Sequence, residues 1–121
     1  MTDETETRDK AAQAIAAQND RFRAQIGRDP DVPGRIVLTA GVEAKGPAFV
    51  QRALQAVQVF SEFGEDNDPH GERDFGAFEI ENEKLFWKID LYDLAYRYGS
   101  EAPADPARTR RVLTLMLAHE Y

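Results

Sequence analysis

Five carboxylates and one imidazole lie within ten consecutive residues in the middle of the chain. Residues 65–74 read EDNDPHGERD, and the six groups are Glu65, Asp66, Asp68, His70, Glu72 and Asp74. Carboxylates and an imidazole can hold a divalent metal, and exposed carboxylates can also attract a basic protein surface. We name residues 65–74 the acidic loop and take it as the candidate site.

Metal binding is the first chemistry that this spacing indicates. Asp66, Asp68 and His70 stand at positions one, three and five of a calcium-binding loop, and Gly71 stands at position six. The twelfth position, which needs a bidentate glutamate, is Ala77, so the match fails there. Zinc or another transition metal held by the same three side chains is the alternative, and it would make the protein a small metal-dependent hydrolase. Turn formation by Asp-Asn-Asp-Pro-His-Gly accounts for these residues without a ligand, so we expect no metal.

The distribution of charge favours a protein partner. Between Ser61 and Asp93 eleven acids face three bases, while the whole chain carries a net charge of −7. An exposed acidic face would bind a basic protein surface, such as the nucleic-acid groove of a host enzyme. The other interpretation is that the acidic loop docks on arginines near the end of the sequence, which are Arg108, Arg110 and Arg111. The acidic balance argues against direct nucleic-acid binding, which needs a basic surface.

No catalytic group stands out from the sequence. Asp90 and Asp93 form a second pair of carboxylates, which would act as an acid and a base only if burial separated their pKa values. We expect them instead to be solvated charges at a strand edge, with Lys88 as a partner. The chain has no cysteine and no Ser/His/Asp order, so we assign no catalytic residue and no cofactor.

A β-hairpin is predicted directly after the acidic loop. Two runs, 75–80 and 85–92, alternate apolar and polar residues as strands do. Asn82 lies between them, where a tight turn needs a left-handed backbone conformation. The same alternation places Trp87, the single tryptophan, on the face that we expect to lie on the core.

Three helices and one further strand are predicted around this hairpin. Residues 8–26 have the narrow apolar stripe of a peripheral helix, and the β-branched residues of 35–42 predict a strand. A second helix begins near Pro47, since proline suits the first helical turn. Pro106 suits the start of a last helix that runs close to Tyr121.

This order of elements, α-β-α-β-β-α, predicts an α+β fold. The simplest arrangement is a three-stranded sheet that contains the hairpin, with the helices packed mainly on one face. With 121 residues, 42% of them hydrophobic, the chain can form one domain. In it residues 35–121 are the core, 8–26 the peripheral helix and 1–7 a disordered end. No apolar run is long enough to span a membrane, so we expect a cytoplasmic protein without a membrane partner, and the oligomeric state stays open.

Several motifs resemble a small bacterial family known only as a domain of unknown function. They are VLTAGV, DNDPHGERDFGAFEI, FWKIDLYD, GS-x-x-P-A-D-P and RVLTLMLAHEY, which together span residues 35–121. Arg73 and Leu91 stand where other members more often have His and Tyr, and the departure at Arg73 weakens a metal role for the acidic loop. The family's members tend to occur on plasmids and other mobile elements beside antirestriction-type genes. The resemblance therefore implies an accessory or host-defence role and supplies no catalytic residues.

Overall fold

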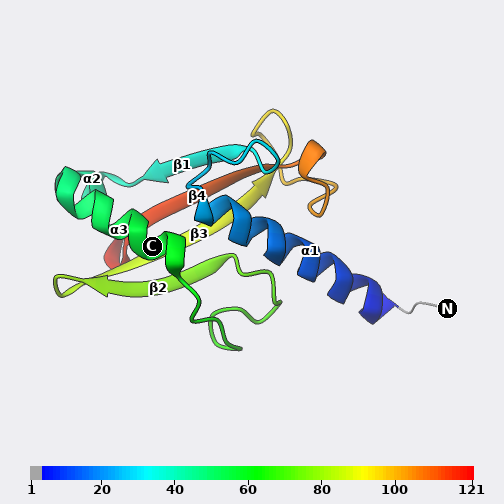
Figure 1. Ribbon diagram of the computed structural model, residues 1–121, viewed down its shortest axis with the longest axis horizontal. Helices are drawn as coiled ribbons and strands as arrows, with labels where there is room; N and C mark the ends of the chain where they lie inside the picture. Colours follow the sequence, from blue (N-terminus) through cyan, green and yellow to red (C-terminus); the bar gives the residue numbers. More distant parts are fainter. Residues whose placement is uncertain (1–3) are drawn as a thin grey trace.

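The computed structural model describes residues 4–121 and has an α+β architecture with a mixed four-stranded sheet. The chain forms α1 (Glu4–Ala24), β1 (Gly34–Leu38), α2 (Ala40–Ala44), α3 (Pro47–Val59), β2 (Phe75–Ile80), β3 (Glu83–Tyr92), the 3-10 turn η1 (Pro106–Arg108), β4 (Arg110–Leu117) and the 3-10 turn η2 (Ala118–Glu120) (Figure 1). Among residues 4–121, no helix has both the length and the apolar character needed to cross a membrane.

The strands are ordered β1-β4-β3-β2 across the sheet. β1 runs parallel to β4, whereas β4 with β3 and β3 with β2 are antiparallel pairs. The predicted hairpin is therefore confirmed as β2 and β3. Its turn uses Glu81 and Asn82, whose φ angles are 53° and 65°, as a two-residue turn with a left-handed backbone requires.

The predicted three-stranded sheet is wrong, because residues 110–117 form a fourth strand in the interior of the sheet and not a helix. Only a single 3-10 turn follows Asp105, whose carboxylate accepts a hydrogen bond from the backbone N–H of Ala107. The run RVLTLML fits both a helix stripe and a strand buried on one face, and periodicity cannot separate the two in so short a segment. Pairing with β1 and β3 decides for the strand.

Two boundaries also differ from the sequence-based expectation. Helix α1 begins at Glu4, so residues 4–7, predicted to be disordered, are helical, while residues 1–3 lie outside the described part. The strand predicted over 35–42 ends at Leu38, and the short helix α2 takes its last residues. Helix α3 begins at Pro47 as predicted.

The core lies between one face of the sheet and the helices. Alternation along β3 and β4 directs Leu85, Trp87 and Ile89 into it together with Leu113 and Leu115, all at most 4% exposed. Figure 1 shows that the first half of α1 projects beyond the sheet, and the buried residues of α1 come from its second half. Trp87 is fully buried, as expected for the core face of the hairpin.

Trp87 has a closely fitted aromatic environment. The rings of Phe60 and Phe63 meet its indole edge-on, with centroids 5.5 Å and 6.1 Å away. Gly76 lies across from it in the hairpin, where any side chain would collide with the indole. The indole of Trp87 therefore fills the space between the rings of Phe60 and Phe63 and the backbone of Gly76.

Replacing Trp87 by alanine should lower the free energy of unfolding by about 3–5 kcal/mol, because it leaves a cavity among these rings. Urea denaturation followed by circular dichroism measures the change. Val59→Ala is the control, since Val59 is 78% exposed and its replacement should change stability by less than about 0.5 kcal/mol. Equal stability of the two variants would show that Trp87 does not hold the core.

Candidate functional site

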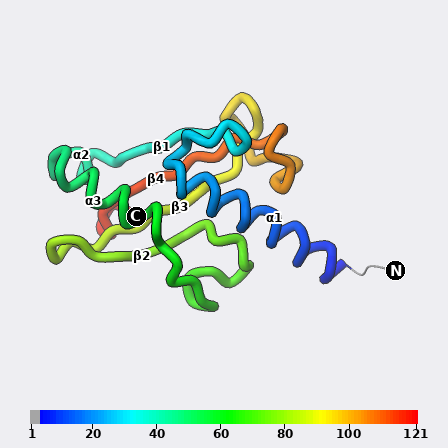
Figure 2. Tube along the Cα trace, viewed as in Figure 1, coloured from blue at the N-terminus to red at the C-terminus, as the bar shows by residue number. Residues whose placement is uncertain are grey.

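The acidic loop is held in shape by its own side chains. Asn67 accepts a hydrogen bond from the Gly64 N–H and donates one to the carbonyl of Glu62, at 2.8 Å and 2.9 Å. Asp68 accepts from the Arg73 N–H at 2.9 Å, which closes the second half of the loop. In the view of Figure 2 the loop lies below β2, and it connects the end of α3 to the start of the hairpin. It thus has a defined shape without any bound ion.

Helix α1 is the element on which the acidic loop docks. The guanidinium of Arg73 pairs with Asp20 at 2.8 Å, and the Asn19 side chain donates to the carbonyl of Glu72 at 2.9 Å. The alternative docking on the arginines near the end of the sequence is therefore wrong. Arg111 is buried and hydrogen-bonds to uncharged side chains of α1, and the exposed Arg108 makes no ion pair within residues 4–121.

The structure divides the six predicted site residues into two sets. Glu65, Asp66 and His70 are exposed, and their side chains have no ion pair or hydrogen bond among residues 4–121. Asp68 is partly exposed and caps the loop. Glu72 and Asp74 are half-buried beside α1 and the hairpin, so they cannot belong to the same exposed face. Only the first part of the loop is an open acidic surface.

Burial perturbs the two inner carboxyl groups. It raises the pKa of Glu72 above its ordinary value, and the neighbouring Asp74 raises it further. Burial is also the main cause of the raised pKa of Asp74, to which the charge of Asp68 adds. Both groups are thus easier to protonate in the folded chain, because the effect of burial outweighs the stabilisation that nearby His70 gives to their charged forms.

The side chains of the acidic loop do not converge on one point. Within residues 4–121, no group of three or more His, Cys, Asp or Glu side chains is placed to hold a metal ion. The three side chains of the alternative ligand set, those of Asp66, Asp68 and His70, are therefore not brought together. His70 and Glu72 instead line a hollow of about 530 Å³ between the loop and the first half of α1.

Asp90 and Asp93 do not form an acid-base pair. Asp90 makes an ion pair with Lys88 at 3.0 Å, with both side chains about 40% exposed. Asp93 accepts hydrogen bonds from the backbone N–H groups of Ala95 and Arg97, and so shapes the turn after β3. Their roles are a surface ion pair and a loop cap.

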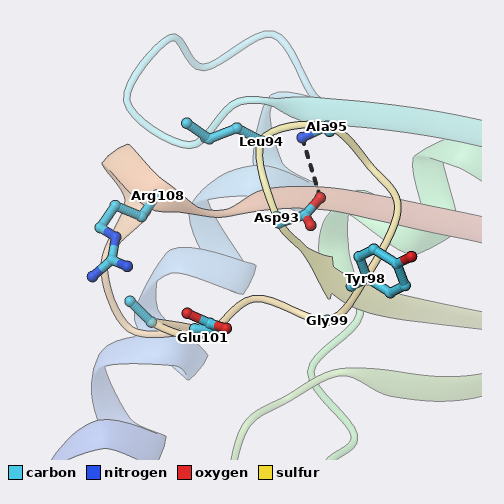
Figure 3. Close-up of a pocket in the computed structure, with 8 residues that line it drawn as sticks. Asp93, Leu94, Ala95, Tyr98, Gly99, Glu101 and Arg108 are labelled. Atoms are coloured by element: carbon cyan, nitrogen blue, oxygen red, sulfur yellow. Dashed lines mark hydrogen bonds between the residues drawn. The ribbon is translucent and has the colours of Figure 1, made fainter.

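A second hollow lies in the segment between β3 and η1, which the sequence left as a plain loop. It has a volume of about 520 Å³ and is lined by Asp93, Leu94, Ala95, Tyr98, Gly99, Glu101, Ala102 and Arg108. Figure 3 shows Asp93 turned to the backbone of Ala95, while the side chains of Arg108 and Tyr98 lie on opposite sides of the hollow. Its lining combines the carboxylates of Asp93 and Glu101 with the guanidinium of Arg108 and the exposed side chains of Leu94 and Tyr98.

One signal in the sequence could have located this hollow. The motif GS-x-x-P-A-D-P supplies part of its wall, and its Ser100 hydroxyl contacts that of the buried Thr109 at 2.8 Å. Leu94 and Tyr98, which are 55% and 74% exposed, lie just before this motif. Large apolar residues followed by a run of turn residues were therefore the available clue.

The structure defines a small α+β protein with an acidic loop that docks on α1 and a hollow in the segment after β3. Residues 38–120 match the model of DUF3768, a protein of unknown function. The match covers more than half of the chain, so the chain belongs to this family, and the resemblance seen in its motifs is confirmed. No curated protein and no solved structure matches the chain.

The double substitution Glu72→Gln with Asp74→Asn should raise the melting temperature at pH 7. The folded chain raises both pKa values above their ordinary 4.5 and 3.8, so it binds more protons than the unfolded chain as pH rises through that window. Stability is therefore lost on going to higher pH, and neutral side chains avoid this loss. Thermal melts at pH 7 and at about pH 3, below the unfolded pKa values, measure the effect.

The gain should vanish at the lower pH, where the native carboxyl groups are protonated in both states. Glu65→Gln with Asp66→Asn is the control, because these two side chains are exposed and make no ion pair or hydrogen bond within residues 4–121. A double variant at 72 and 74 that melts below the native chain at pH 7 would show that the ionised carboxylates stabilise the fold.

Proposed function

We propose that this protein is a non-enzymatic binding protein whose acidic loop recognises a basic surface of another protein. The observation that carries the proposal is the pair Glu65 and Asp66, which is exposed and has no cation partner among residues 4–121. Asp68, Arg73 and the carbonyl of Glu72 are instead engaged within the fold, through a loop cap, Asp20 and Asn19. Exposed charges of this kind add little to stability, so their surplus is better explained by recognition.

The rigidity of the loop supports the same proposal. The hydrogen bonds of Asn67 and Asp68 fix the backbone on both sides of the exposed pair. A partner would meet carboxylates that are already in place, so less conformational entropy is lost on binding. A disordered acidic tail would lack this advantage.

The partner that fits is a protein with a basic groove, such as a host enzyme that handles nucleic acid. Carboxylates held at fixed positions can replace phosphates as partners of its lysine and arginine side chains. We further propose that the protein is an accessory factor of a mobile element, the role that the family resemblance implies. Its association with the enzyme would inhibit or modulate the enzyme's activity.

The variant Glu65→Gln with Asp66→Asn should lose the partner while keeping its melting temperature within a degree or two, because neither carboxylate is paired within the fold. Native and variant proteins are used as paired baits in a bacterial lysate, and captured proteins are quantified by mass spectrometry. Binding of the purified partner is then titrated at about 50 mM and about 200 mM salt, where electrostatic association should weaken with increasing salt.

The matched control removes the same number of charges elsewhere. Glu4→Gln with Glu43→Gln neutralises two exposed carboxylates on α1 and α2 and should leave capture unchanged. Equal loss of capture by both double variants would show that net charge alone matters. No loss by the variant of residues 65 and 66 would exclude the loop as the binding surface.

A further inference from the structure

The face of the sheet that points away from the helices forms a second kind of surface. The register of the four strands places on it every residue that alternates with the core positions. We call it the helix-free face, and its residues are Arg35 and Val37 of β1, Phe75, Ala77 and Glu79 of β2, Lys84, Phe86, Lys88, Asp90 and Tyr92 of β3, and Arg110, Val112, Thr114 and Met116 of β4. Most of them are partly or fully exposed.

Aromatic rings gather at one end of this face. Phe75 and Phe86, on neighbouring strands, have ring centroids 5.2 Å apart. Tyr121 meets both rings edge-on, with centroids 6.1 Å and 5.5 Å away, and is itself 74% exposed. The three side chains form an aromatic cluster over β2 and β3. Phe75 and Phe86 are partly exposed, and Tyr121 is the most exposed of the three.

Cations accompany the aromatic rings at both ends of the face. The Lys84 ammonium lies 5.6 Å from the centroid of the Phe86 ring. At the opposite edge, on β1, the Arg35 guanidinium stacks on the Tyr96 ring at 3.8 Å. Neither Lys84 nor Arg35 makes an ion pair within residues 4–121, and both are exposed, so both charges are available to a ligand.

The charge of this face is opposite to that of the molecule. It carries four cations, Arg35, Lys84, Lys88 and Arg110, against the two carboxylates of Glu79 and Asp90, although the chain as a whole carries −7. The sheet thus collects bases that are scattered along the sequence from residue 35 to residue 110.

We propose that the helix-free face binds single-stranded nucleic acid, independently of the protein partner of the acidic loop. Unstacked bases stack on exposed aromatic rings, and nearby lysine and arginine side chains contact the phosphates. A four-stranded sheet with one open face and aromatic side chains on neighbouring strands supplies both contacts at once. Exposed rings can stack on unpaired bases, whereas a duplex keeps its bases stacked inside the helix, so paired strands should bind less well.

Fluorescence anisotropy with a labelled single-stranded oligopyrimidine of about 16 nucleotides tests the proposal. We expect saturable binding at about 50 mM salt that weakens at about 200 mM, and weaker binding of a duplex of equal length. Tyr121→Ala should reduce the affinity by about tenfold, because one stacking partner is lost. Arg35→Glu with Lys84→Glu should abolish binding, and circular dichroism melts verify that each variant is folded.

The control is Lys10→Glu with Arg28→Glu, which makes the same charge change at exposed bases of α1 and the following loop. It should leave affinity for the oligonucleotide nearly unchanged. Equal weakening by both charge reversals, or no saturable binding of either strand form at low salt, would overturn the proposal. If these variants instead lose a captured protein while the oligonucleotide fails to bind, the face is a protein interface and the proposal is wrong.

The two proposals fail separately. Glu65→Gln with Asp66→Asn should leave oligonucleotide binding intact, since these residues lie outside the helix-free face. Loss of oligonucleotide binding in that variant would place the nucleic-acid contact at the acidic loop and contradict the proposal for the sheet.

Discussion

The buried guanidinium of Arg111 is the group that joins the separate parts of this structure. It is fully buried on β4, and it donates to Asn19 and Gln18 of α1 at 2.8 Å each. No carboxylate among residues 4–121 pairs with it, and burial lowers its pKa to about 10. A buried cation is tolerated only where hydrogen bonds replace its hydration, so the position of α1 is strongly constrained. Asn19 also links Arg111 to the acidic loop, because its side-chain amide donates a hydrogen bond to the backbone carbonyl of Glu72.

A second buried arginine, Arg23, also joins α1 to its surroundings, and unlike Arg111 it has a carboxylate partner, Asp20, at 2.8 Å. Arg23 of α1 donates to the last carbonyls of α3, at Val57 and Phe60, at 2.7 Å and 3.0 Å. Its guanidinium also lies over the Trp87 ring, 4.8 Å from the centroid. Helix α1 is thus attached largely through polar side chains, which explains its narrow apolar stripe. The family match begins at residue 38, so Arg111 lies inside it and the helix that satisfies Arg111 lies outside.

The fold also separates charges that the sequence mixes. The hairpin that follows the acidic loop contributes Lys84 and Lys88 to the helix-free face. The loop and the hairpin are adjacent in sequence, yet one belongs to a negatively charged surface and the other to a positively charged one. The net charge of a protein predicts its partners well only when charge is spread evenly over the surface. Where positive and negative side chains lie on separate surfaces, an acidic protein can still present a basic surface. The two surfaces give this small protein two independent places at which another molecule could bind.

Local chemistry in the sequence determined the hairpin, the start of α3 and the turn-rich character of the acidic loop, because alternation, a helix-starting proline and turn residues act over a few neighbours. Only the tertiary structure decided the identity of β4. Its run of apolar residues suits either periodicity, and its parallel partner β1 lies more than seventy residues earlier in the chain. The same holds for Arg111, which the sequence grouped with Arg108 and Arg110 as a docking place for the acidic loop, and for the inner carboxylates of the loop. Burial and pairing depend on contacts between distant segments, and no local pattern records which segments those will be.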